Sequence, residues 1–140
     1  MNDTPNASEL LAIARATFET VILRTLPDAT RYTGLMIAAA MAIAQREIDA
    51  GDTAGRAEHE RLCRLMSERH EAGAGKALQT ALRSYNRRLA KEIRAGRFDG
   101  TRRADLFEHL RRTTEEKLAV SNPKALPSEQ SKGQPGDAAR

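Results

Sequence analysis

Apolar residues recur at three- and four-residue spacing along most of this chain of 140 residues, which is the pattern of amphipathic helices. The pattern predicts five helices, over about residues 8–26, 28–50, 54–69, 76–95 and 101–120. Asn6 and Glu9 have the spacing of a capping pair before the first helix, and Pro27 ends it. Gly51 and Gly96 follow the second and fourth helices, where a glycine commonly stops a helix.

The first two helices distribute their apolar residues differently. The first carries one apolar face, made of Leu10, Ile13, Ala14, Thr17 and Val21. The second contains Gly34–Ala44, eleven consecutive residues without a polar side chain. A helix that is apolar nearly all round is packed on several sides, so we expect the second helix at the centre of the fold. A ladder of small residues would let a neighbouring helix approach it closely: Gly34, Ala38 and Ala42.

Composition supports an all-α fold, because only five aromatic residues accompany a charged fraction of 30% and a hydrophobic fraction of 40%. We predict a single-domain bundle of about five helices over residues 7–126, with a central apolar helix. A disordered N-terminus at 1–6 and a disordered tail at 127–140 would flank it. The eleven-residue run is shorter than the roughly 20 apolar residues that cross a membrane. The N-terminus does not read as a secretory signal, so we expect a cytoplasmic protein.

Charge is concentrated in one segment. Residues 76–97 hold seven basic and one acidic side chain, a net of +6, whereas residues 1–52 hold four basic and seven acidic, a net of −3. The basic residues of the fourth helix lie off its apolar face: Arg83, Arg87, Arg88, Lys91 and Arg94. They fit a solvated surface, a site for the phosphates of a coenzyme A thioester, or a contact with an acidic partner. Nucleic acid fits less well, because the sequence has no helix-turn-helix pattern.

No motif predicts catalysis. In HEAGAGKAL, His70 and Ala77 stand where a phosphate-binding loop needs Gly and Ser or Thr. Residues 59–63 begin like the helix of a zinc protease, but Cys63 replaces the second histidine and no third ligand follows. We interpret Cys63 as a small core residue, and His70 and His109 as solvated side chains. The expectation is a protein that is not an enzyme and holds no metal or cofactor.

Three segments resemble one family: ASELLAIARATFETVILRTLP, RYTGLMIAAAMAIAQRE and EKLAVSNPKAL. They are similar to small bacterial all-helical proteins of a domain-of-unknown-function family, encoded beside aminoglycoside-phosphotransferase-like kinases and acyl-CoA dehydrogenases. The resemblance spans about residues 7–126, and its closing segment is the most specific. The family pattern has Asn at the position of Ala39, so this chain lacks that amide.

The resemblance implies an accessory role. In levulinate-type catabolism a similar small protein works with the kinase-like subunit that phosphorylates the hydroxyl of 4-hydroxyacyl-CoA, which the dehydrogenase-like enzyme then processes. By analogy, this chain would be a non-catalytic protein that supports an aminoglycoside-phosphotransferase-like kinase, with an acyl-CoA dehydrogenase as a possible second partner. An alternative is an acyl-CoA-binding module, in which the basic helix holds the phosphates and the side of Gly34, Ala38 and Ala42 accepts the acyl chain. Homo-oligomerisation stays open.

Candidate binding residues come from the basic helix and from the segments that carry the resemblance: Arg31, Tyr32, Arg46, Glu47, Arg83, Arg87, Arg88, Lys91 and Asn122. Simpler roles are also open for three of them. Arg46 and Glu47 can form ion pairs with neighbouring helices, and Asn122 before Pro123 can serve as a helix stop.

Overall fold

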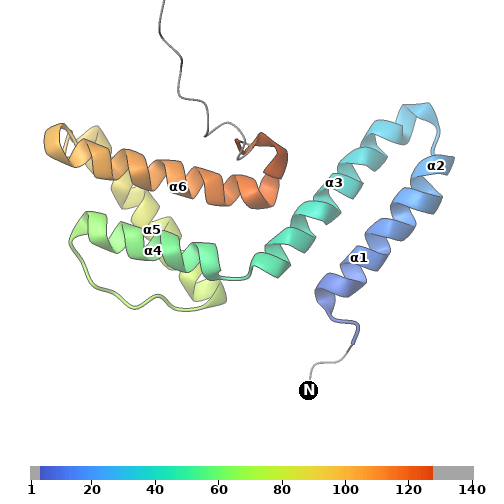
Figure 1. Cartoon of the computed structure of the whole chain (residues 1–140), viewed down its shortest axis with the longest axis horizontal. Coiled ribbons are helices and arrows are strands. Elements are labelled where there is room, and N and C mark those ends of the chain that lie inside the picture. The colour runs from blue at the N-terminus through green and yellow to red at the C-terminus, as the bar shows by residue number, and fades with distance from the viewer. Residues whose placement is uncertain (1–3, 128–140) are drawn as a thin grey trace, which may run out of the picture.

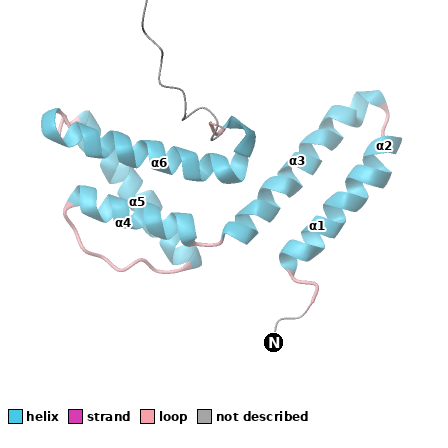
Figure 2. Cartoon of the chain, viewed as in Figure 1, coloured by secondary structure: helices cyan, strands magenta, loops and turns pink. Residues whose placement is uncertain are grey.

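The computed structural model describes residues 4–127, which contain helices and no strand (Figure 2). The longer helices are α1 (Ala7–Thr17), α3 (Asp28–Ala50), α4 (Thr53–Met66), α5 (Gly75–Arg94) and α6 (Arg103–Ser121). Shorter segments are the π-helical η1 (Phe18–Ile22), α2 (Leu23–Thr25) and the 3₁₀ turns η2 (Gly100–Arg102) and η3 (Pro123–Ala125). Because η1 and α2 continue α1, the predicted all-α bundle of five principal helices is confirmed. The predicted disorder at residues 1–3 and 128–140 lies outside the described residues.

The helix ends follow local signals in the sequence. Asn6 and Glu9 form a capping box, in which Glu9 N donates to Asn6 Oδ1 at 3.0 Å and Asn6 N donates to Glu9 Oε2 at 2.7 Å. Gly51 and Gly96 have φ values of 54° and 73°, a region that favours glycine. These three predictions of helix boundaries are confirmed.

The chain after Asn6 forms an antiparallel hairpin, in which α1, η1 and α2 run up and α3 returns beside them (Figure 1). The two sides meet along a narrow line where Gly34 and Ala38 are buried. A Cβ atom on Gly34 would lie 2.6 Å from Leu26 Cδ1 and 2.7 Å from Leu23 Cδ1. The small residues therefore do allow close packing, and leucine side chains from α2 and its C-cap fill the space beside Gly34.

The prediction that α3 is packed on several sides is wrong. This helix does lie between α1 and α6 (Figure 1), but Leu35, Met36 and Ile48 remain 52%, 54% and 48% exposed. The segment from α1 to α2 packs along one side of α3, and α6 contacts its second half, where the Arg46 side chain donates to the carbonyl of Val120 at 2.6 Å. None of the helices within residues 4–127 is long and apolar enough to cross a membrane.

The core of the fold lies instead around α4, which packs against both α5 and α6. Its buried residues come from all three helices and the turn after α5: Leu62, Leu65, Leu78, Leu82, Leu89, Phe98 and Leu106. The alternation of leucines with Arg and Glu in residues 54–69 predicts a surface helix with one narrow buried stripe, and this prediction is wrong because α5 and α6 both cover the helix. The prediction for Cys63 is confirmed, since that side chain is buried in α4.

Candidate functional site

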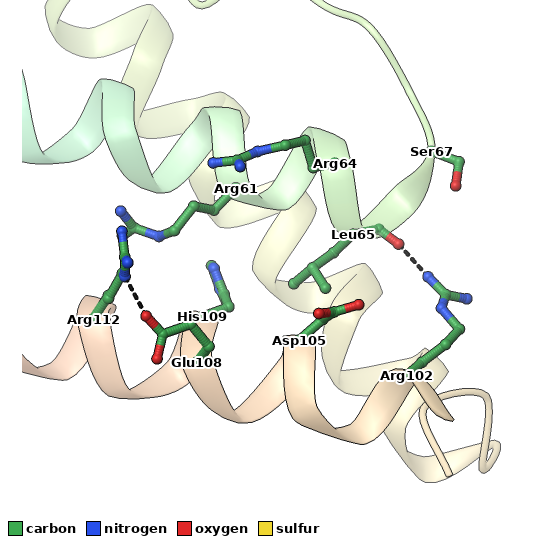
Figure 3. A pocket seen from close by; sticks show the side chains of 9 residues that line it. All are labelled: Arg61, Arg64, Leu65, Ser67, Arg102, Asp105, Glu108, His109 and Arg112. Carbon is green, nitrogen blue, oxygen red and sulfur yellow. Dashed lines mark hydrogen bonds and ion pairs between the residues drawn. The ribbon is translucent and has the colours of Figure 1, made fainter. Parts of the chain in front are cut away.

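A pocket of about 510 Å³ opens between α4 and α6. Its lining is strongly charged: Arg61, Arg64, Leu65, Ser67, Arg102, Asp105, Glu108, His109 and Arg112. Figure 3 shows the side chains of Arg61 and Arg64 extending from α4, with His109 and Arg112 rising toward them from α6. None of these arginines is among the binding residues predicted from the sequence, because they come together only where α4 packs against α6.

Arg61 links α4 to α6 at one end of the pocket. Its guanidinium donates to both carboxylate oxygens of Glu116, with distances of 2.8 Å from Nη1 and 2.5 Å from Nη2. Nη2 also lies 3.3 Å from the hydroxyl of Thr113. A bidentate pair of this kind fixes the guanidinium plane, and the side chain is only 10% exposed. The buried Nε of Arg61 nevertheless has no hydrogen-bond partner.

His109 lies on the wall of the pocket and is 3% exposed, so our expectation of a solvated side chain is wrong. Its buried Nδ1 has no hydrogen-bond partner. Burial lowers the pKa of His109 below the ordinary value, and the neighbouring charge of Arg61 lowers that pKa further. Helical spacing offered a signal for this burial, because Leu106, His109 and Thr113 follow one another by three and four residues and share a face.

The other arginines of the pocket differ in how many of their hydrogen-bond donors already have a partner in the chain. Arg102 donates to the carbonyl of Leu65 and lies over the ring of Phe98, with 4.6 Å between Cζ and the ring centroid. Arg112 uses only its Nε, which donates to Glu108. The guanidinium of Arg64 forms no hydrogen bond or ion pair with another residue of the described chain. Donors for a ligand therefore remain on Arg64 and Arg112.

The predicted basic surface of α5 is only partly assembled. Arg87, Arg88 and Lys91 line a shallow pocket of about 430 Å³. Arg88 is already paired with Glu68, whose pKa this hydrogen bond lowers. Arg83 lies apart, in a pocket where it meets residues of α3, α4 and α6.

The candidates on α3 do not form one site. Arg31 and Tyr32 are exposed near the start of the helix, and fifteen residues at 1.5 Å each place them roughly 20 Å from Arg46 and Glu47. Arg46 contacts α6, and Glu47 lines the same pocket as Arg83.

The structure also shows where two further positions lie, the candidate Asn122 and Ala39. Asn122 caps α6, its backbone N–H donating to the carbonyl of Leu118, so its predicted role as a helix stop is confirmed. Ala39 is exposed, so an Asn at this position would project from the surface.

One element of the acyl-CoA hypothesis is wrong. The side of α3 that carries Gly34 and Ala38 was expected to accept an acyl chain, but Leu23, Leu26 and Phe18 already occupy the space beside Gly34. Ala38 is 6% exposed. The packing within the hairpin therefore leaves no space for an acyl chain beside Gly34.

His59 and Cys63 are not joined by a third metal ligand within residues 4–127. Cys63 Sγ lies 3.7 Å from Nδ1 of His59 and 3.8 Å from the hydroxyl of Tyr85. Within residues 4–127, no group of three or more His, Cys, Asp or Glu is placed to hold a metal ion.

A second surface feature is the apolar exterior of the hairpin. We call it the hairpin surface, and its residues are between 42% and 73% exposed: Leu10, Ile13, Val21, Ile22, Tyr32, Leu35, Met36, Ile37 and Ile48. Leu10, Ile13 and Val21 belong to the apolar face predicted for the first helix, so that face is present but uncovered by the rest of the chain. Isolated exposed apolar side chains are ordinary, whereas a contiguous group indicates an interaction surface.

Comparison with family models finds one match, to Domain of unknown function (DUF6285), over residues 24–125. The matched range runs from α2 to the end of η3 and includes the whole α4–α6 pocket. No curated protein and no solved structure matches the chain. Because the family model covers more than half of the sequence, the chain belongs to the DUF6285 family.

Proposed function

We propose that this protein is a non-catalytic accessory protein that supports a kinase-like enzyme acting on hydroxyacyl-CoA in fatty or short-chain acid catabolism. The observation that carries the proposal is the hairpin surface, which the chain leaves uncovered. The choice of partner, a kinase of the aminoglycoside-phosphotransferase type, is taken from the family resemblance. In this proposal the hairpin surface docks onto the kinase.

The hairpin surface extends over more than one face of α3. Successive residues of an α-helix lie about 100° apart, so Leu35 and Ile37 point in nearly opposite directions. One partner therefore contacts a part of the hairpin surface, and the part that we propose for the kinase contains Ile37 and Ile48.

Part of this surface points away from the rest of the chain. Ile37 and Ile48 are eleven residues apart in α3 and therefore lie on one face. Arg46, which contacts α6, follows Ile37 by nine residues, so it lies about half a turn away at roughly 100° per residue. A partner can reach Ile37 and Ile48 without displacing α6.

The experiment combines the purified kinase with the wild-type chain or with the double variant Ile37→Lys, Ile48→Lys. We expect the wild type to co-elute with the kinase and raise its activity on hydroxyacyl-CoA, and we expect the double variant to weaken the complex at least tenfold. Phe107→Lys is the matched control, because Phe107 is 57% exposed on α6 and lies outside the hairpin surface. Exposed substitutions of this kind change stability by only about 0.5 kcal/mol, so folding is retained.

Full activity of the kinase alone would contradict the proposal. A second contradicting result is a wild-type homodimer that the double variant converts to a monomer without any effect on the kinase, since the hairpin surface would then serve a second copy of this chain.

A second candidate function is binding of coenzyme A phosphates by α5. The observation that favours it is the shallow pocket where Thr80 and Ser84 hydroxyls adjoin Arg87 and Lys91. Its acyl chain would need a place other than the Gly34 side of α3, which is closed.

A further inference from the structure

The α4–α6 pocket collects positive charge that its own acidic residues do not balance. Its lining has four arginines and two carboxylates, Asp105 and Glu108, and a third carboxylate, that of Glu116, pairs with Arg61, so the net charge is about +1. Charge of one sign in a concave site concentrates counter-ions of the other sign. The complement of this site is a small anion.

Two buried polar atoms in the pocket walls lack partners, one from each helix. Nε of Arg61 belongs to α4 and Nδ1 of His109 to α6. Buried polar groups are hydrogen-bonded in the great majority of cases, so both atoms are candidates to bond a group that enters the pocket. Arg61 cannot easily turn toward another partner, because Glu116 holds its guanidinium at both ends.

The donors that remain are of the kind that bind oxyanions. Arg64 and the two terminal amino groups of Arg112 present guanidinium N–H groups, which match the geometry of phosphate and carboxylate oxygens. His109 is kept neutral near pH 7, because burial lowers its pKa, and a neutral imidazole still has one N–H to donate. In Figure 3 the side chains of Arg61 and Arg112 extend toward one another, the His109 ring points from α6 toward α4, and the Arg64 side chain runs along α4.

We propose that the α4–α6 pocket is a binding site for a small oxyanion group, foremost a phosphate monoester, held by Arg64 and Arg112 and reached by His109. This site is separate from the hairpin surface and does not depend on the proposed accessory role. A volume of about 510 Å³ admits a phosphate with a small organic group attached.

The test uses inorganic phosphate and glycerol 3-phosphate as probes, with acetate as a singly charged comparator, at constant ionic strength. Titration calorimetry on the full chain should show binding of both phosphates, and Arg64→Gln with Arg112→Gln should weaken it at least tenfold. Arg64 is exposed and unpaired among the described residues, so Arg64→Gln alone provides a variant that keeps the fold. Tighter binding of phosphates than of acetate also supports the proposal.

Two control variants locate the site. Arg69→Gln removes an exposed arginine outside the pocket, and Arg87→Gln with Lys91→Gln removes the cations of α5. If the α5 variant alone abolishes binding, the anion site lies on α5 and the pocket proposal is overturned. Equal losses in all the variants would reflect general electrostatic attraction and would also overturn it.

A spectroscopic readout separates binding from structure. A bound dianion favours the imidazolium form, so phosphate should raise the pKa of His109 followed by proton NMR, while the exposed ring of His70 should respond much less. Absence of any phosphate binding at millimolar concentration, or a His109 signal that does not move, would overturn the proposal.

Discussion

At the scale of single residues, His109 shows how tertiary packing changes the chemistry of a side chain. The sequence places it among charged neighbours, yet α4 covers it and leaves its Nδ1 without a partner. Arg61 and Lys117 oppose protonation of the ring, and Glu58 and Glu116 favour it. Burial outweighs these charges, so the pKa of His109 is lowered.

This lowered pKa predicts how stability depends on pH. Below about pH 6.5 the unfolded chain binds a proton at this position more readily than the folded chain, so the free energy of unfolding should fall as pH decreases from 6.5. The contribution of one site is at most about 1.4 kcal/mol per pH unit. Urea unfolding between pH 7.5 and 5 should show a shallower decline for His109→Gln than for the wild type. The same slope in His109→Gln would show that other groups cause the decline.

At the scale of the elements, the hairpin depends on one close crossing. Gly34 faces Leu23 and Leu26 at distances that leave no room for a methyl group. The π-helical η1 precedes these leucines, and such a segment changes which residues face the neighbouring helix. Hydrophobic periodicity at 3.6 residues per turn therefore could not identify the side of the first helix that packs on α3.

Gly34→Ala should destabilise the hairpin, because overpacking costs about 1–3 kcal/mol and exceeds the helix-propensity gain of about 1 kcal/mol. Gly55→Ala is the matched control, since Gly55 is also helical and its new Cβ would lie 3.1 Å from Leu78 Cδ2, a longer contact than the 2.6 Å at Gly34. Urea unfolding of the two variants should give a larger loss for Gly34→Ala. An equal or smaller loss would mean that Leu23 and Leu26 move aside at little cost.

At the scale of the whole molecule, the two halves of the fold differ in how much they bury. The body of α4, α5 and α6 holds the hydrophobic core, whereas α1 has no buried residue and α3 has two. Local opening is easiest where few apolar contacts are buried. The isolated chain should therefore be less stable in its hairpin than in its body.

Amide hydrogen exchange can measure this difference. Amides in the middle of α1 and α3 should exchange at least tenfold faster than amides of α4 near Leu62, under conditions where the opening equilibrium sets the exchange rate. If the hairpin surface docks on a kinase, adding that partner should slow exchange in the hairpin and leave α4 unchanged. Equal protection of both halves in the isolated chain would contradict this account.

The helical fold and its local boundaries follow from the order of the residues alone. Capping atoms, glycines with positive φ and Pro27 act on their immediate neighbours, so Asn6, Gly51 and Gly96 could be interpreted without knowledge of the packing. The burial of Cys63 also followed from its residue type. The family resemblance pointed to a domain of unknown function, and the DUF6285 match confirms that much.

Only the tertiary structure decided which faces are covered. Burial depends on contacts between residues distant in the chain, such as Arg61 with Glu116 or Gly34 with Leu26, and periodicity contains no information about which helices become neighbours. For that reason the apolar α3 proved largely exposed, while the charged α4 became the centre of the core. The arginines of the α4–α6 pocket come together through the same packing, which no single segment of the sequence could reveal.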